Sequence, residues 1–476
     1  MSRRAELLGV ALVTLGAIAF FLLAPTYPNY DAYYHLVWGR ELLDGQTPTL
    51  EAYKAPTQHP LEILVGGLLG AVLGTGAERA FVLIAVLSLV SLGWAVFRLG
   101  WRIFGALPGL AAAFFTLSSF SLLLLAARGY RDVPFLALVF WAAVRIVERR
   151  DDRWTMALLV LAGLLRPEAW ILAGLFALWR RSIPLLAATA VAPLIWAGVD
   201  LAVTGDPLRS LTGTSELAEE LGRERGIAKV PGAFVSFIVD ALRLPVAAMA
   251  AAGFVLAFQR LGWRRLIVPL ALLGSGVVTF VGTGAAGLSI LPRYLTVPTV
   301  ALTLFAGYAL AGFVTLPPGR TRKLWTSGAA VLLAGGFAFV GLRAHVVKTL
   351  TTELAFIDGT HADLDAILHA PEVTAGAKCG PITFPNYRLV PDTRWLLDLP
   401  ADRVGARSAK RHARGVAIFV VGNKSLRRYG FADGASPSTN APDPGFHLAA
   451  RRGRFVAYVS CGAGGTDTPS GSSTSS

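Results

Sequence analysis

The chain contains 476 residues, of which 54% are hydrophobic and only 16% are charged, and its mean hydropathy is +0.56. This is far more apolar than a soluble globular protein needs for its core, so the composition excludes an ordinary soluble enzyme and predicts a polytopic membrane protein. The net charge of +14 does not indicate nucleic-acid binding, because Lys and Arg gather in short segments between apolar runs.

The first apolar run, residues 6–24, follows the charged start "MSRRAE". It is long for the apolar part of a signal peptide and lacks a convincing small-residue cleavage site, so we expect a retained signal anchor. The first external loop, residues 25–60, contains a predicted helix that starts at Asp31 and ends at Leu43. We expect this helix to lie against the outer leaflet, with its tyrosines and Trp38 at the membrane interface.

The next apolar run, residues 61–74, has only about 14 residues, whereas a full crossing needs about 20, so we expect a partial or interfacial helix. If this helix does not cross and the chain crosses the membrane eleven times in all, every short segment rich in Lys and Arg faces the cytoplasm. These crossings are predicted at 6–24, 79–97, 106–127, 133–147, 155–166, 169–180, 183–203, 233–257, 266–284, 290–315 and 325–343. They predict a protein of the plasma membrane, with its N-terminus in the cytoplasm and its C-terminal part outside.

The chain is therefore predicted to be an α-helical membrane domain (1–343), a small extracytoplasmic α/β or β-rich domain (344–463) and a disordered, low-complexity tail (464–476). The β-rich runs are residues 415–423 and 454–461. A second long external loop, residues 204–232, has Glu and Arg at helical spacing, which predicts either an amphipathic helix at the acceptor entrance or a solvated loop helix.

The two cysteines, Cys379 and Cys461, both lie in the C-terminal part. If this part is extracytoplasmic they can form one disulfide, and if it is cytoplasmic they are two buried thiols.

Ionisable residues outside the basic loops all fall on the predicted outer side of the membrane. Because charged groups at membrane depth are costly, their gathering on one leaflet predicts a one-sided polar cavity, as in an enzyme. The candidate site residues are Asp31, His35, His59, Arg128, Asp132, Arg166, Glu168, Arg293 and Tyr294.

Each candidate also has a plainer interpretation. Asp31 can be a helix cap, although His35 follows one turn later on the same face, as in a carboxylate–imidazole pair. His59 can face solvent, and Arg166 and Glu168 can simply tie two short helices together. Asp132 with Arg131 can be a surface pair, and Arg293 with Tyr294 an interfacial anchor.

The stretches "DAYYHLVWGRELLDGQTP", "QHPLEIL", "RDVP" and "PRY" resemble motifs of the GT-C superfamily of membrane glycosyltransferases. Among its members, the chain is similar to the bacterial aminoarabinose transferases and protein O-mannosyltransferases. The resemblance implies a polyprenyl-phosphate sugar donor, a lipid, glycan or protein acceptor, and inversion at the anomeric carbon.

The resemblance also implies roles for individual residues. Asp31 takes the place of the first-loop acidic residue, as a general base or as part of a metal site, and Asp132 that of the second. Arg128, Arg166 or Arg293 would hold the donor phosphate. Ala32 follows Asp31 where many relatives have a second acidic residue, so a divalent metal is possible but not required by the sequence. Leu61 replaces the second proline of the family's H/K-P-P-L stretch.

Two other functions compete with a glycosyltransferase. A transporter or flippase of a lipid-linked saccharide predicts polar residues through the bilayer midplane and an internal repeat, and the sequence has neither. A non-catalytic assembly protein, anchored in the membrane and binding cell-wall polymer through its tail, does not need eleven spans. The sequence favours the transferase.

Overall fold

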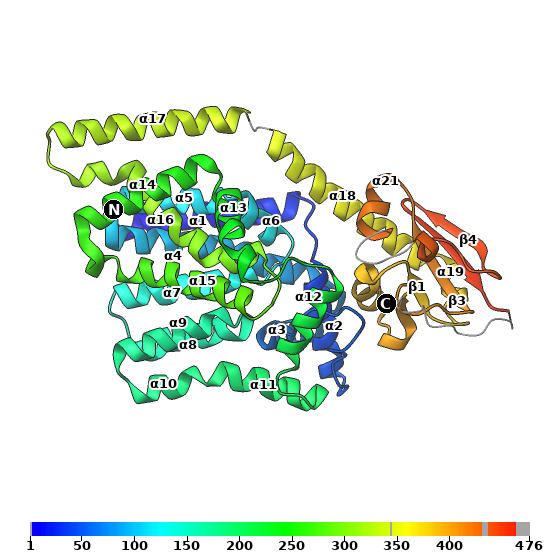
Figure 1. Ribbon diagram of the computed structural model, residues 1–476. Helices are drawn as coiled ribbons and strands as arrows, with labels where there is room; N and C mark the ends of the chain where they lie inside the picture. Colours follow the sequence, from blue (N-terminus) through cyan, green and yellow to red (C-terminus); the bar gives the residue numbers. More distant parts are fainter. Residues whose placement is uncertain (1, 343–344, 431–436, 463–476) are drawn as a thin grey trace. The chain divides into compact units, whose positions relative to one another are not determined.

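The computed structural model describes residues 2–342, 345–430 and 437–462. The chain forms two compact units, each built from more than one segment of the sequence (Figure 1). The membrane unit comprises residues 1–26, 59–62 and 80–351, and the C-terminal unit comprises residues 27–58, 63–79 and 352–476. Most of the predicted first external loop therefore folds with the C-terminal part of the chain. The tail predicted to be disordered, 464–476, lies outside the described residues.

The described residues of the membrane unit form helices joined by turns and loops, with no strand among them. Its helices are α1 (Arg3–Leu23), most of α4 (Ala77–Phe104), α5 (Ala106–Leu117), α6 (Phe120–Ala127), α7 (Asp132–Val147), α8 (Asp152–Leu165), α9 (Glu168–Arg180), α10 (Ile183–Thr189), α11 (Val191–Thr204), α12 (Arg209–Glu220), α13 (Val230–Leu242), α14 (Leu244–Arg265), α15 (Ile267–Ala285), α16 (Thr296–Ala311) and α17 (Arg320–Leu342), with 3₁₀ turns at Ile227–Lys229, Pro292–Leu295 and Gly312–Thr315. The predicted helix in the loop 204–232 is therefore present, as α12.

Within the described residues, seven helices are long and apolar enough to cross a membrane. The count rises to eight if α5 and α6, which are bent by 56° relative to each other, form one span. The protein is thus a multi-pass membrane protein. The predicted number of eleven crossings also includes α7, α8 and α9, which have only 16, 14 and 13 residues, and it stays a prediction.

The predicted break between two short helices is confirmed at Arg166. Helix α8 ends at Leu165, and Arg166 has the extended φ of −151° and ψ of 132°. Residue 167 is proline, whose ring disfavours helical geometry in the residue before it. Helix α9 then starts at Glu168, beside α8 (Figure 1). The break leaves the charged Arg166 at a junction between helices.

The single span predicted over 233–257 is wrong. The structure has two helices there, because α13 ends at Leu242 and α14 starts at Leu244. Arg243 between them has a φ of +64°, and Pro245 follows at the start of α14. A proline has no N–H for the preceding helix and its ring clashes with that helix, so the apolar pattern runs on while the helix stops.

The C-terminal unit contains two helices from the early part of the chain and a small mixed domain. Its elements are α2 (Tyr30–Leu43), α3 (Pro60–Leu73, from Ile63 onward), a 3₁₀ turn at Gly74–Gly76, α18 (His345–Leu368, from Thr352 onward), α19 (Pro371–Gly376), β1 (Ile382–Phe384), α20 (Val390–Leu397), β2 (Val404–Ala406), β3 (Gly415–Val420), α21 (Asn423–Ser425), β4 (His447–Arg452) and β5 (Phe455–Ser460), with further turns at Tyr387–Leu389, Ala401–Arg403, Leu426–Gly430 and Pro437–Asn440. Both predicted β-rich runs are strands, β3 and β5.

The sheet has the order β2-β1-β3-β5-β4. Strand β1 pairs in parallel with β2 and β3, whereas β5 pairs in an antiparallel manner with β3 and β4. The central strand β3 is buried along its whole length, as its unbroken apolar sequence "GVAIFV" predicts. Of the two predicted forms of the C-terminal domain, α/β or β-rich, the structure shows the first.

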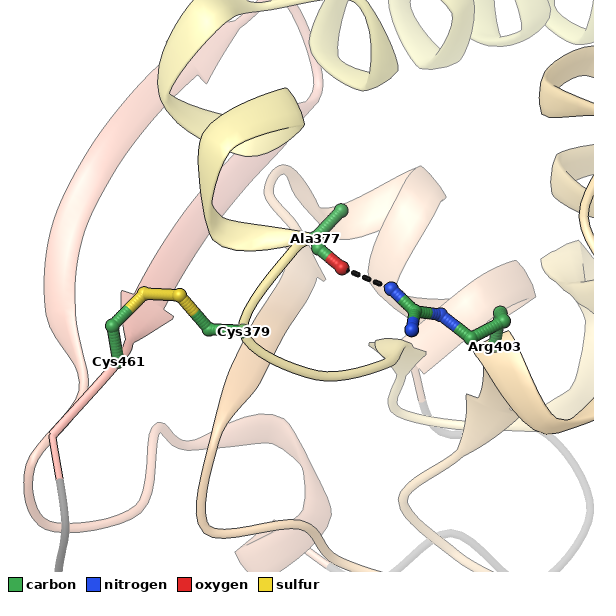
Figure 2. Close-up of a disulfide and its surroundings, with 4 residues drawn as sticks. All are labelled: Ala377, Cys379, Arg403 and Cys461. Carbon is green, nitrogen blue, oxygen red and sulfur yellow. Dashed lines mark hydrogen bonds between the residues drawn. A yellow bond between two sulfur atoms is a disulfide. The ribbon is translucent and has the colours of Figure 1, made fainter.

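The two cysteines form a disulfide, whose Cα atoms lie 5.3 Å apart (Figure 2). Cys379 follows α19 and Cys461 follows β5, so the bond closes a segment of 82 residues that contains all five strands. Beside it, the Arg403 guanidinium donates a hydrogen bond to the carbonyl oxygen of Ala377. The bond therefore joins the start of the sheet segment to its end.

Removing this disulfide is expected to destabilise the sheet domain by about 2–5 kcal/mol, because closing a long segment restricts the unfolded chain. Urea unfolding of the purified Cys379→Ser/Cys461→Ser variant, followed by proteolysis of the C-terminal unit, measures the effect. Reductant should lower the midpoint of the native protein to that of the variant and leave the variant itself unchanged. An identical midpoint for the native protein with and without reductant would contradict the prediction.

Candidate functional site

Three candidate residues meet in the membrane unit, at the ends of three short helices. Asp132 opens α7, Arg166 follows α8 and Glu168 opens α9. The Arg166 guanidinium donates one hydrogen bond to the Asp132 carboxylate and another to Glu168. Asp132 is fully buried, and the side chains of Arg166 and Glu168 are 3% and 12% exposed. One arginine is thus held by two carboxylates away from water.

Arg293 and Tyr294 join this cluster from the 3₁₀ turn that precedes α16. The Arg293 guanidinium lies 3.7 Å from the Asp132 carboxylate, and the Arg166 guanidinium lies 5.6 Å from the centre of the Tyr294 ring. The side chain of Arg293 is 28% exposed, far more than that of Arg166. Of these two arginines, Arg293 is therefore the one that a ligand can reach.

A further ion pair contributes a residue that the sequence analysis did not select. Glu62 and Arg131 lie 3.1 Å apart, with side chains that are only 3% and 4% exposed. Glu62 comes three residues after His59 in "QHPLEIL", and Arg131 directly precedes Asp132. Their charges were visible in the sequence, but their pairing joins positions 69 residues apart. A local pattern does not reveal such a pair.

The other two candidates of the membrane unit lie against aromatic rings. His59 is 6% exposed, and its ring stands edge-on to Trp196 at 5.2 Å between centres. It is therefore not the solvent-facing histidine of the plainer interpretation. Arg128 ends α6, with its guanidinium 5.8 Å from the centre of the Tyr130 ring.

The charged groups of the cluster and the basic loops lie at opposite ends of the same helices. Helix α7 runs from Asp132 to a last turn with Arg145, and α9 runs from Glu168 to Arg180. Because cytoplasmic loops are the ones enriched in Lys and Arg, this polarity supports the prediction that the cluster faces the other side of the membrane.

Asp31 and His35 belong to the C-terminal unit, in helix α2. The Asn29 side chain caps this helix by accepting hydrogen bonds from the N–H groups of Asp31 and Ala32. Asp31 is therefore not the N-cap, contrary to its plainer interpretation. His35 Nδ1 lies 2.5 Å from the main-chain oxygen of Asp31, so this contact ties the imidazole to the helix backbone.

The expectation that α2 lies with its aromatic rings at the membrane interface is wrong. Tyr33, Tyr34 and Trp38 are fully buried within the C-terminal unit. One reason is the close packing of α2 against α3, where a Cβ atom added at Gly66 would lie only 2.7 Å from the main-chain oxygen of His35. A glycine at this position lets the two backbones approach each other, and the rings of α2 are then covered by protein.

Polar contacts hold the start of α2 in the same unit. The Tyr33 hydroxyl donates to the Glu78 carboxylate at 2.8 Å and lies 3.1 Å from His361 Nε2. Tyr27, just before α2, donates to Asp392 and packs its ring edge-on against His361 at 4.1 Å. Burial lowers the pKa of His361 to about 3, so this imidazole is neutral at ordinary pH.

The buried His361 is expected to make the stability of the C-terminal unit sensitive to acid. Between its folded pKa of about 3 and its unfolded pKa of about 6.5, the unfolded chain binds a proton that the folded chain does not, so stability falls as the pH drops below about 6.5. From pH 6.5 to pH 5 the loss is expected to reach about 2 kcal/mol, and His361→Gln should remove it. Unfolding of the C-terminal unit at several pH values measures the difference.

His369 provides the control for this prediction. It lies at the end of the same helical segment as His361, but its side chain is 59% exposed. His369→Gln should keep the acid sensitivity of the native protein. Equal pH dependence in the native protein and His361→Gln would show that the prediction is wrong.

Among the described residues, no group of three or more His, Cys, Asp or Glu side chains is arranged to hold a metal ion. The single acidic residue at Asp31, followed by Ala32, does not provide the paired carboxylates that a first-loop metal site would need.

The fold is that of a multi-pass helical membrane protein with a mixed C-terminal domain and a buried charged cluster at one end of its short helices. Solved membrane proteins share this fold over nearly the whole chain. ArnT from Cupriavidus metallidurans bound to undecaprenyl phosphate superposes with a TM-score of 0.58 at 15% identity, over 96% of this chain and 98% of that one. The same protein in the apo state gives 0.54 at 16% identity, over 95% and 98%.

The oligosaccharyltransferase of Archaeoglobus fulgidus, tethered to an acceptor peptide, superposes with a TM-score of 0.51 at 12% identity, over 96% of this chain and 74% of that one. By sequence, no family model matches the chain and no curated protein is detectably similar. The likeness therefore establishes a shared fold, as the resemblance to GT-C proteins implied.

Proposed function

We propose that the protein transfers a sugar from a polyprenyl-phosphate donor to an acceptor outside the cytoplasm, with inversion at the anomeric carbon. The observation that carries this proposal is the end-to-end fold similarity to ArnT, which was solved with undecaprenyl phosphate bound. The buried charged cluster supports it, because membrane proteins keep such groups mainly at polar sites.

In this reaction Asp31 takes the proton from an acceptor hydroxyl. The acceptor oxygen forms a bond to the anomeric carbon, and the bond between that carbon and the phosphate oxygen breaks. The polyprenyl phosphate leaves with one more negative charge than the donor carried. A cation near the phosphate therefore stabilises the transition state more than the bound donor and raises the rate.

Arg293 is the best candidate for this cation. Arg166 is already held between Asp132 and Glu168, and its 3% exposure leaves little surface for a ligand. Arg293 combines contact with the same cluster and a side chain that is 28% exposed. We assign the donor phosphate to Arg293, and to Arg166 and Asp132 the task of holding the surrounding helices and charges in place.

An apolar pocket of about 220 Å³ lies among the same helices, toward the ends that carry Arg145 and Arg180. It is bounded by α7, α8, α9 and α15, and Leu172 of α9 lines both this pocket and a small one beside Arg293. The lining is almost wholly aliphatic and aromatic, which suits part of a prenyl chain. We expect prenyl units of the donor to pack there.

The charges and the disulfide support the proposed location. Disulfides persist in oxidising compartments, so the Cys379–Cys461 bond supports a C-terminal unit outside the cytoplasm. The Lys- and Arg-rich ends of the helices then face the cytoplasm, together with the N-terminus, in the plasma membrane. Cysteine labelling at residue 102 from outside the cell would contradict this topology.

Radiolabelled polyprenyl-phosphate sugars test the activity. Purified protein is mixed with a panel of donors carrying mannose, glucose, arabinose or aminoarabinose, and with cell envelopes from a strain that lacks the protein. We expect label from at least one donor to pass into envelope material, which mass spectrometry then identifies as lipid, glycan or protein. Transport of intact donor across vesicles, without transfer of the sugar, would instead indicate a flippase.

A further inference from the structure

Within the C-terminal unit, helix α20 contacts the segments at both ends of α2, the helix that carries Asp31. At the far end, Arg394 of α20 is only 1% exposed and forms an ion pair with Glu41 in the last turn of α2. The Arg394 guanidinium also donates to Thr49 Oγ1 at 2.9 Å and to the main-chain oxygen of Leu399 at 3.3 Å. One buried side chain therefore connects α2, the loop that follows it and the C-terminal sheet domain.

Arg40, also in the last turn of α2, adds a second connection between α2 and α20. Its guanidinium donates to the main-chain oxygens of Arg394 at 2.9 Å and of Trp395 at 3.3 Å. It also lies 2.9 Å from the Asp398 carboxylate and 5.2 Å from the centre of the Trp395 ring. These contacts use the C-terminal end of α20, where the last carbonyl groups of a helix lack partners within it.

The near end of α2 is held by another residue of α20. Asp392 accepts the hydrogen bond from Tyr27, and burial together with this carboxylate raises the pKa of Tyr27 well above 10, so the phenol stays protonated and donates. Asp31 follows Tyr27 by four residues and precedes Arg40 by nine. Helix α20 thus provides a partner on either side of Asp31 in the sequence.

We propose that Arg394 is a positioning residue, through which α20 fixes α2 and places the Asp31 carboxylate for proton transfer. The inference rests on the proposed function and gives α20 a part in it. Buried ion pairs alone are weak evidence for stability, but in some proteins they fix one arrangement of the elements they join. A shift of about 1 Å in a reacting group can lower a rate about 100-fold.

Arg394→Lys and Arg394→Ala test the proposal with the donor and envelopes that the native protein uses. For Arg394→Ala we expect a 10- to 100-fold lower kcat and a KM for the donor within about twofold of native. Arg394→Lys should recover part of the kcat, because lysine keeps the positive charge but lacks the planar set of N–H donors of the guanidinium. The acidic limb of the pH–rate profile should stay in place in both variants, because Asp31 itself is unchanged.

Hydrogen–deuterium exchange gives a readout that does not depend on activity. Amides of residues 30–43 should exchange faster in Arg394→Ala than in the native protein. Arg454→Gln is the matched control, because Arg454 pairs with Asp363 inside the same unit, and neither residue has a described contact with α2. This control should change neither kcat nor the exchange of residues 30–43.

The two readouts separate the outcomes. Unchanged exchange and unchanged kcat in Arg394→Ala would overturn the proposal, and so would faster exchange with a native kcat, because α2 would then be held for stability alone. A native protein that transfers no sugar from any donor would overturn the proposed function, and the positioning role would fall with it. Faster exchange together with a lower kcat supports both.

Discussion

Asp31→Asn is expected to lower the rate of sugar transfer by about 10²–10⁴-fold, the range that a positioned general base contributes. An amide has nearly the shape of the carboxylate but does not take the proton from an acceptor hydroxyl. The helix should stay intact, because its cap is the Asn29 side chain bonded to the N–H groups of Asp31 and Ala32. Transfer of labelled sugar to the envelope acceptor measures the loss.

Asp44→Asn is the control for this substitution, because Asp44 is an exposed carboxylate at the other end of the same helix. It should transfer sugar at the native rate. The acidic limb of the pH–rate profile should be present in the native protein and Asp44→Asn and absent in Asp31→Asn. A folded Asp31→Asn protein with native activity would show that another group, or no group, takes the proton.

Arg293→Ala is expected to lower kcat by about 10²–10³-fold, the usual loss when one group that stabilises a developing negative charge is removed. Arg293→Lys should retain part of the activity, because it keeps the positive charge but not the planar pair of donors. The stability of the membrane unit should change less than in a variant of Arg166, because Arg293 is the more exposed of the two arginines. Single-turnover transfer and thermal unfolding measure the two effects.

Arg166→Gln should behave in the opposite way. It leaves the carboxylates of Asp132 and Glu168 without the arginine that joins them, and loss of one partner from a buried pair costs about 3–5 kcal/mol. Its main effect should therefore be a lower unfolding temperature. If Arg293→Ala were the unstable variant and Arg166→Gln the stable, inactive one, the assignment of the donor phosphate would have to be reversed.

Much of the charged cluster was predictable because its residues stand out locally. Asp132, Arg166, Glu168 and Arg293 are charged residues beside apolar runs, and the cost of burying them in a membrane marks them as a set. Their sequence neighbours do not show which of them pair. The proposed roles of Arg166 and Arg293 rest on exposures of 3% and 28%, which depend on how α7, α8 and α9 pack with the turn before α16.

The sequence alone determined what depends on local chemistry. The apolar runs predict a multi-pass membrane protein, the proline after Arg166 predicts the break between α8 and α9, and the β-branched runs predict β3 and β5. Each of these features depends on hydropathy or backbone preference within a few residues, so it can be read before the chain is folded.

Only the tertiary structure decided the surroundings of Asp31. The sequence of α2, with its tyrosines and Trp38, fits a membrane interface as well as a protein core, and the structure buries these rings in the C-terminal unit. The ion pair that holds this helix joins Glu41 to Arg394, 353 residues further along the chain. Neither residue carries a local sign of its partner, because a contact over such a distance exists only once both segments have folded.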